Sequence, residues 1–308
     1  MSVRLPQALR RLATWLPAAL VLAVTLPCQA AVLGYCDPPA EPTAAQQDRI
    51  FRFGAIVKAE LEKSGQSLVL MSRSGLALGR FGQRYSHAGF SLKASGNTPW
   101  SVRQLYYACD ESRPRLYDQG LSGFVLGSVE PNLGFLSVIF LPADEAAALE
   151  RVALDNRLAL QLLGSTYSAN AYPFNLSYQN CNQWVAEMLA LAWGGLAAEG
   201  EPRAQAQDWL RAMSYAPTVF DVGWRPLMWA GAFIPWLHSD DHPAEDIAMA
   251  RYLVSMPASI EAFVAARLPA ATRVEFCHNE RHVLIRRGWE LIAEGCEAGP
   301  GDTLIVFD

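Results

Sequence analysis

The segment best suited to chemistry is residues 180–189, Asn-Cys-Asn-Gln-Trp-Val-Ala-Glu-Met-Leu, which contains Cys181. Apolar side chains follow Cys181 at spacings of three, four, seven and eight residues, the period of one face of a helix. Asn180 can cap this helix, and Gln183 can complete a capping box. A thiol in a first helical turn lies near unpaired N–H groups and the positive end of the dipole, which favour the thiolate. Cys181 is therefore a candidate nucleophile, and the alternative is a small buried core residue.

A thiol nucleophile needs a base, and His87 is the best candidate among the five histidines. It lies in the segment Tyr-Ser-His-Ala-Gly-Phe, residues 85–90, which reads as an apolar strand. The small residues beside it leave room for another group to approach the ring. The alternative is a structural histidine that is hydrogen-bonded within its strand.

The other four histidines form two i, i+4 pairs, His238 with His242 and His278 with His282, and such spacing can supply metal ligands. The first pair lies in an Asp-Asp-Pro loop and the second between two expected strands. Neither segment resembles a zinc-binding helix, so we expect no metal and no cofactor.

The positioning elements alternate between helices and strands. A helix is expected over residues 40–63, opened by Pro42 and Thr43. An antiparallel pair follows at 85–92 and 100–108, with His87 on its first arm. Further expected elements are strands at 67–71 and 135–141, helices at 142–163, 181–193, 204–214 and within 243–268, and C-terminal strands at 273–276, 283–286 and 303–307. Residues 110–134 read as irregular, and the tryptophan-rich segment 224–237 reads as partly buried loop rather than as a membrane-interface or glycan-contacting surface.

The composition indicates a globular protein, and the N-terminal segment indicates export. The 308 residues are 51% hydrophobic and 18% charged, with a net charge of -5, so no basic face for nucleic acid is expected. Arginines near the N-terminus precede an apolar run over residues 13–27 and the small residues that a signal peptidase reads. We expect a signal peptide over residues 1–30, cleaved near Ala30, and a periplasmic or secreted chain with no stable membrane span. The alternative is an uncleaved membrane anchor, for which the apolar run is short.

Export changes how the cysteines are interpreted. Removal of Cys28 leaves five, an odd number, so at least one thiol stays unpaired within the chain. Cys277 and Cys296 flank a short segment and form one candidate disulfide, and Cys36 with Cys109 would form the other. Cys181 is then the free thiol, although sequence alone does not fix the pairing.

Two segments together carry a family resemblance. A Ser-His-small-Gly-apolar strand at residues 86–90, followed far downstream by an Asn-Cys-x-x-aromatic-Val helix at 180–185, resembles the circularly permuted papain-like proteins. That group includes NlpC-type cell-wall peptidases and lecithin:retinol acyltransferase, and the matching core is residues 67–193. The mature chain resembles more closely a bacterial family of unknown function, DUF2145, in its segments at 85–89 and 101–111.

The resemblance implies an α+β, circularly permuted papain-like fold, with an antiparallel sheet packed on the cysteine-bearing helix and a C-terminal extension. Residues 31–308 would form this single domain. Cys181 would be the nucleophile, His87 the base and Gln104, on the paired strand, the third catalytic residue. An amide oxygen can accept from the imidazole N–H and fix its tautomer, although the group more often has a histidine or an acidic residue there. Tyr85 and Tyr178 are the candidate substrate-binding residues.

The expected function is a thiol hydrolase or acyltransferase of the cell envelope. Its substrate would be an amide or ester, with a cell-wall peptide as the first candidate and a lipid-like acyl compound as the second. The alternative is an exported, non-catalytic binding or assembly protein on a papain-like scaffold.

Overall fold

The computed structural model describes residues 36, 41–127, 130–196 and 200–307, so the expected signal peptide lies outside the described residues. The chain divides by its internal contacts into Met1–Pro38 and Pro39–Asp308. The elements below belong to the second unit. In the described ranges, no helix combines the length and the hydrophobicity needed to span a bilayer.

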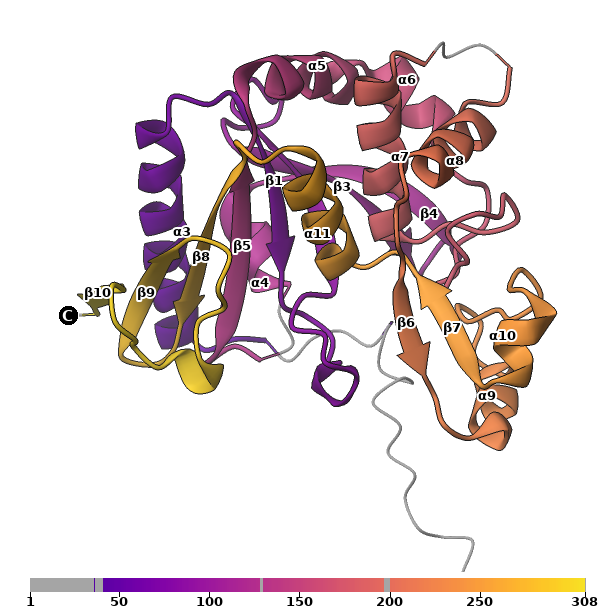
Figure 1. Ribbon diagram of the computed structural model, residues 1–308. Helices are drawn as coiled ribbons and strands as arrows, with labels where there is room; N and C mark the ends of the chain where they lie inside the picture. The colour runs from indigo at the N-terminus through magenta and orange to yellow at the C-terminus, as the bar shows by residue number, and fades with distance from the viewer. Residues whose placement is uncertain (1–35, 37–40, 128–129, 197–199, 308) are drawn as a thin grey trace, which may run out of the picture. The chain divides into compact units, whose positions relative to one another are not determined.

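The central element is an eight-stranded sheet in the order β10-β9-β8-β5-β1-β2-β3-β4 (Figure 1). Neighbouring strands in it are antiparallel. Strands β6 and β7 form a second, two-stranded antiparallel sheet. The strands are β1 Leu68–Arg73, β2 His87–Leu92, β3 Ser101–Ala108, β4 Arg113–Gln119, β5 Gly134–Phe140, β6 Thr218–Asp221, β7 Arg251–Val254, β8 Thr272–His278, β9 His282–Arg287 and β10 Thr303–Val306. The expected mixed α+β fold with a large antiparallel sheet is confirmed.

Helices cover both faces of this sheet. They are α3 Ala44–Lys63, α4 Leu121–Leu126, α5 Ala143–Leu154, α6 Asn156–Gln161, α7 Cys181–Gly194, α8 Pro202–Ala212, α9 Arg225–Gly231, α10 Ala244–Ala248 and α11 Pro257–Arg267, with short 3-10 turns at Gly79–Phe81 and Glu294–Cys296. The start of α3 agrees with the sequence, because Thr43 caps it in a capping box with Gln46.

Successive side chains along β1 and β2 point to opposite faces of the sheet, so the apolar core has a part on each face. Val69 and Met71 of β1 pack in one apolar cluster with α3 and α4. On the opposite face, Phe90 of β2 lies against Trp184 of α7, with ring centroids 5.9 Å apart. In Figure 1, α11 lies in front of the strands and α4 behind them. The helix that carries Cys181 therefore packs on the face opposite α3 and α4.

Several expected elements differ from the structure. The helix expected over 142–163 is divided in two, because Asp155 leaves helical geometry and caps α6 with its side chain. The segment taken as irregular contains the edge strand β4 and helix α4. The tryptophan-rich segment is partly buried, as expected, but it contains helix α9 rather than a loop alone: Met228 and Trp236 are buried, whereas Trp224 and Trp229 are 65% and 64% exposed.

Candidate active site

Cys181 is the first residue of α7, and the local sequence accounts for its position. The side-chain oxygen of Asn180 accepts a hydrogen bond from the Gln183 N–H at 2.6 Å, and Gly195 ends the helix with a positive φ of 60°. The expected capping box is not completed, since the Gln183 amide turns inward and donates to Glu187 and to the Pro173 carbonyl. The Cys181 side chain is buried, and its thiol is the free one in the described part of the chain.

A buried polar cluster fixes the segment that leads into Cys181. The carboxylate of Glu187, on α7, accepts from Gln179 at 2.6 Å and from Gln207 at 2.9 Å. It also pairs with Arg203 of α8, whose Nε lies 3.0 Å from Oε2. Arg203 in turn donates to the backbone carbonyls of Leu176 and Tyr178. The cluster thereby ties the loop before Cys181 to two helices, a set of contacts that local sequence patterns do not predict.

His87 opens β2 and lies beside Gln104 of β3, as predicted from the sequence. Nε2 of His87 and Oε1 of Gln104 are 2.6 Å apart, and the Gln104 amide nitrogen donates to Gln119 Oε1 at 2.7 Å. Because an amide oxygen only accepts, this contact places the imidazole proton on Nε2 and leaves Nδ1 unprotonated in the neutral ring. Gln104 is fully buried, so the orientation of its amide is set by Gln119.

Arg73, at the end of β1, completes the surroundings of His87. The two residues are direct partners in the β1–β2 ladder. The Arg73 guanidinium donates to Tyr106 Oη at 2.6 Å, to the Ser74 carbonyl and to the Gly127 carbonyl, and it lies over the Phe124 ring. Sequence reasoning missed Arg73; the available signal was a charged residue ending an otherwise apolar buried strand, Leu-Val-Leu-Met-Ser-Arg.

The starts of α7 and β2 are joined directly. The Asn182 side chain donates from Nδ2 to the carbonyl oxygen of Ser86 at 3.1 Å. The His87 ring, however, points to the α4 side, where it contacts the rings of Tyr106 and Phe124. No hydrogen bond joins the Cys181 thiol to the His87 ring among the described residues. The structure therefore brings their backbones to the same end of the sheet, and their direct contact stays a prediction.

Burial controls the charge state of both groups. It raises the pKa of Cys181 to about 12, against the opposing effects of the Asn182 and Cys181 backbone N–H groups, the Arg73 charge and the Tyr167 hydroxyl. It lowers the pKa of His87 to about 3, helped by the Arg73 charge and opposed by the hydrogen bond to Gln104. Near pH 7 the resting protein therefore holds a neutral thiol and a neutral imidazole.

The two candidate substrate-binding tyrosines lie in different surroundings. Tyr85 is buried, and its hydroxyl bonds Glu275 and accepts from Arg273 at 3.1 Å, so its environment is that of a packing residue. Tyr178 stacks on His238 at 4.1 Å between ring centroids, and its hydroxyl donates to Asp240. Tyr178 is thus held on the loop that precedes Cys181.

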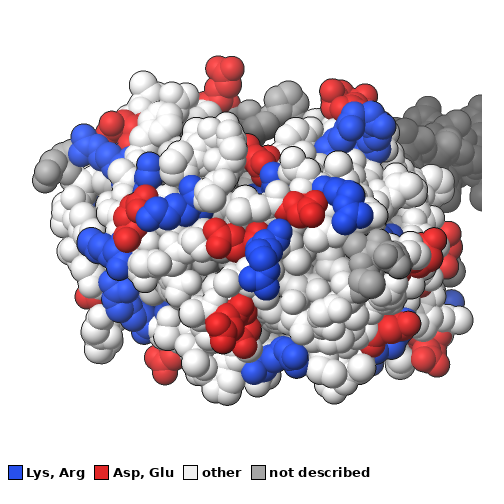
Figure 2. Space-filling view, turned by 90° about the horizontal axis from the view of Figure 1, so that it is seen from above, with Lys and Arg blue, Asp and Glu red and all other residues white. Residues whose placement is uncertain are grey.

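The remaining histidines serve local contacts. The ring of His242 bonds the Asn170 carbonyl at 2.8 Å, and that of His282 bonds the Cys296 carbonyl at 2.9 Å. Within the described ranges, no group of three or more histidine, cysteine or acidic side chains could hold a metal ion. On the face seen in Figure 2, acidic and basic side chains are interspersed, and no broad basic patch is visible there.

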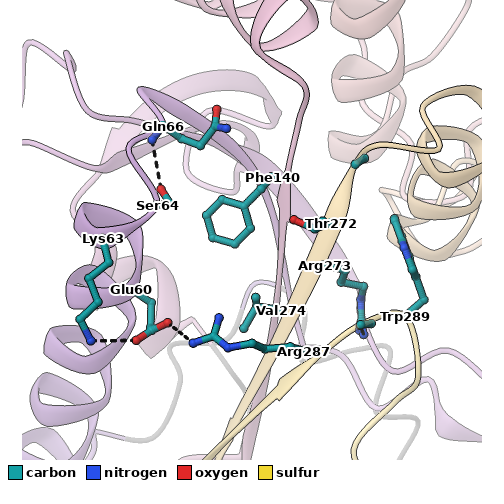
Figure 3. Close-up of a pocket in the computed structure, with 12 residues that line it drawn as sticks. Glu60, Lys63, Ser64, Gln66, Phe140, Thr272, Arg273, Val274, Arg287 and Trp289 are labelled. Carbon is teal, nitrogen blue, oxygen red and sulfur yellow. Dashed lines mark hydrogen bonds and ion pairs between the residues drawn. The ribbon is translucent and has the colours of Figure 1, made fainter.

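A surface depression lies away from these residues. It measures about 820 Å³ and lies between the end of α3 and the strands β5, β8 and β9. Figure 3 shows Glu60 between Lys63 and Arg287 on its wall, with nitrogen–oxygen distances of 3.1 and 2.6 Å, and Phe140 and Trp289 among its apolar members. It contains none of the sequence-predicted site residues.

The cysteines agree with an oxidising compartment. Cys277 and Cys296 form a disulfide with Cα atoms 5.7 Å apart, which confirms that pairing. Cys36 and Cys109 are both disulfide-bonded, as the other expected pairing requires.

One comparison identifies a relationship. A family model described as "Uncharacterized protein conserved in bacteria (DUF2145)" matches residues 60–264, a range that includes Cys181, His87 and Gln104. No curated protein and no solved structure matches the chain.

Proposed function

The chain belongs to the DUF2145 family, and we propose that it is an exported thiol hydrolase or acyltransferase acting on an amide or ester of the cell envelope. One observation carries the proposal. A free thiol opens a helix directly beside the strand start where a histidine is held by a buried glutamine. These are the three residue types that a cysteine acyl-transfer site uses as nucleophile, base and orienting group.

In the proposed reaction, the Cys181 thiol gives its proton to Nδ1 of His87. The thiolate attacks the carbonyl carbon, a C–S bond forms, and the carbonyl oxygen becomes an oxyanion. The oxyanion collapses, the C–N or C–O bond breaks, and His87 returns the proton to the departing amine or alcohol. Water or another acceptor then attacks the thioester, loses its proton to His87 and regenerates the thiol.

The first turn of α7 supplies the oxyanion donors in this scheme. The backbone N–H groups of Cys181 and Asn182 both interact with the sulfur. Unpaired N–H groups at a helix start also favour the negative oxygen that forms on the adjacent carbon. Gln104 would hold the His87 tautomer through both proton transfers, since its amide is itself fixed by Gln119.

The resting charges add a requirement. Because thiol and imidazole are both neutral and not hydrogen-bonded, and the His87 ring points to the face opposite α7, proton transfer needs a movement of the start of α7 against the start of β2 that brings the thiol to Nδ1. Substrate entering beside Cys181 is the proposed trigger, and the isolated protein should therefore be a slow nucleophile. We further propose that the sheet and α7 form a circularly permuted papain-like core, in which the histidine strand precedes the cysteine helix.

The substrate class follows from compartment and family analogy. Two disulfides suit an extracytoplasmic location, and a cell-wall peptide is the first substrate to test there. The second candidate is a non-catalytic binding or assembly protein, and the observation that favours it is the burial and neutrality of Cys181 and His87.

The deciding experiment looks for the acyl-enzyme. Oxidised protein is incubated with peptidoglycan fragments and, separately, with an activated ester, and intact mass shows whether an acyl group is attached to Cys181. The proposal predicts an adduct that C181S abolishes and that H87Q slows by about 100-fold or more.

His278 offers a matched control. It is another buried histidine with a pKa lowered by burial, to about 4, but it lies on β8 beside Phe53. H278Q should acylate like the wild type. Folded wild-type protein that gives neither adduct nor product would favour the binding protein.

A further inference from the structure

Arg73 is a buried cation without an acidic partner. Its acceptors are the Tyr106 hydroxyl and the carbonyls of Ser74 and Gly127, all uncharged. No carboxylate pairs with it among the described residues, and its Nε is buried with no hydrogen-bond partner. The other deeply buried arginines differ, since Arg273 pairs with Glu261 and Arg203 with Glu187.

An unpaired buried charge is costly, and a protein usually supplies it with a counter-ion. The groups of the site nearest to Arg73 are His87, its ladder partner, and Tyr106, which it contacts. Asn182 joins the residue before His87 to the start of α7, and the Arg73 charge acts on Cys181 as well as on His87. The remaining titratable group at the thiol is Tyr167. None of these groups is negative at rest.

We propose that Arg73 is a positioning residue that supplies the fixed positive charge of the Cys181 site, and that its counter-ion is the negative charge that develops during the reaction. This inference rests on the proposed function. The charge favours the thiolate and the tetrahedral oxyanion. It therefore stabilises the charged species that form during the reaction more than it stabilises the resting site. It also makes the His87 imidazolium a stronger acid, which helps that group return its proton to the departing amine or alcohol.

Two measurements on the full oxidised chain test the charge without needing turnover. The first is the rate of Cys181 alkylation by iodoacetamide at pH 8, and the second is the His87 pKa from imidazole NMR. R73Q removes the positive charge, so both pKa values should rise. Alkylation should then slow by roughly tenfold for each unit by which the thiol pKa rises.

R73K separates charge from packing, because it keeps the charge and loses the fork of donors. Its alkylation rate should stay close to that of the wild type. R103Q is the matched control, because Arg103, on β3 of the same sheet, is paired with Asp118. R103Q should change neither the Cys181 alkylation rate nor the His87 pKa. R73M, which is also neutral and keeps an unbranched side chain, replaces R73Q should that variant not fold.

The sign of the change makes the result decisive. A purely structural role for Arg73 would loosen the site on substitution and speed alkylation. Equal or faster alkylation in the neutral variant, with an unchanged His87 pKa, would overturn the inference. An Arg73 effect of the expected sign, in a protein that forms no acyl-enzyme, would retain the inference about charge and reject the proposed function.

Discussion

Asn182 donates a side-chain hydrogen bond to the backbone carbonyl of Ser86, 3.1 Å away, and so ties the residue after Cys181 to the residue before His87. This contact joins two segments 96 positions apart. It fixes the start of α7 against the start of β2 without engaging either candidate catalytic side chain. The buried amide oxygen of Asn182 has no hydrogen-bond partner in the described structure, so the contact to Ser86 is the principal one that the side chain makes.

Asn182→Ala is expected to misplace the two segments. Loss of one buried hydrogen bond should lower the free energy of unfolding by about 1 to 2 kcal/mol. It should slow formation of the acyl-enzyme by about tenfold or more, because small displacements of reacting groups are costly. Urea unfolding and intact-mass kinetics measure the two effects. N97A is the control: Asn97 also donates to a backbone carbonyl, that of Asp118, but on the surface. An N182A protein that acylates at the wild-type rate would show that this contact is not needed.

Stability should depend on pH through His87. Its pKa is 6.5 in the unfolded chain and about 3 in the folded protein, so between these values only the unfolded chain binds the proton. Lowering the pH from 6.5 towards 3 therefore destabilises the fold, at up to about 1.4 kcal/mol per pH unit for this group. H87Q should lose this part of the acid dependence, measured by urea unfolding at pH 7 and pH 4.5. H278Q should lose the part of the acid dependence that His278 contributes, between pH 6.5 and about 4. If the unfolding free energy falls with pH equally in the wild type and in H87Q, the expectation is refuted.

The sequence predicted those parts of the site that depend on local patterns. The capping of α7 by Asn180 and its end at Gly195 follow from rules for helix termini. The β2–β3 pair follows from alternation and a turn, and it brings His87 to Gln104. In each case the residues that determine the element are close together in the chain.

The features that the sequence did not predict depend on contacts between residues far apart in the chain. Glu187 reads as an ordinary polar helix residue, and only the fold surrounds it with Arg203, Gln179 and Gln207. Strand β4 contains Pro114 and charged residues, which is acceptable only because it is an edge strand. Helix α9 was not expected in the tryptophan-rich segment, and the sequence did not show which of its tryptophans would be exposed, as Trp224 is.

The mature, oxidised chain should contain one titratable thiol in denaturant without reductant. Cys277 and Cys296 are paired, Cys36 and Cys109 are disulfide-bonded, and signal cleavage near Ala30 would remove Cys28. Ellman titration with N-terminal sequencing measures both expectations. Two thiols, or a chain beginning at Met1, would contradict export with cleavage.

The Cys277–Cys296 disulfide should contribute to stability by an amount set by the length of the loop that it closes. Its cysteines are 19 positions apart, and a loop of that size corresponds to about 3 kcal/mol in the chain-entropy account. Replacing both cysteines by alanine should lower the unfolding free energy by about that amount, and Cys181 alkylation should not change. A faster reaction at Cys181 would show that the C-terminal strands also control the site.

The Glu187–Arg203 pair should be the most sensitive part of the scaffold. In Glu187→Gln, an uncompensated Arg203 remains in a buried setting, and the new amide N–H group faces donors that previously bonded an oxygen. Removing one partner of a buried ion pair typically destabilises a protein by about 3 to 5 kcal/mol. The loop at 176–178 should also loosen, since Arg203 holds its carbonyls, and Cys181 alkylation should become faster. Urea unfolding and amide hydrogen exchange in this loop measure these effects.

D208A, which breaks the exposed Asp208–Arg211 pair on the same helix α8, should change stability by less than about 1 kcal/mol. An E187Q protein as stable as D208A would mean that the loop before Cys181 is held by packing, and the buried cluster would then not be what positions the thiol.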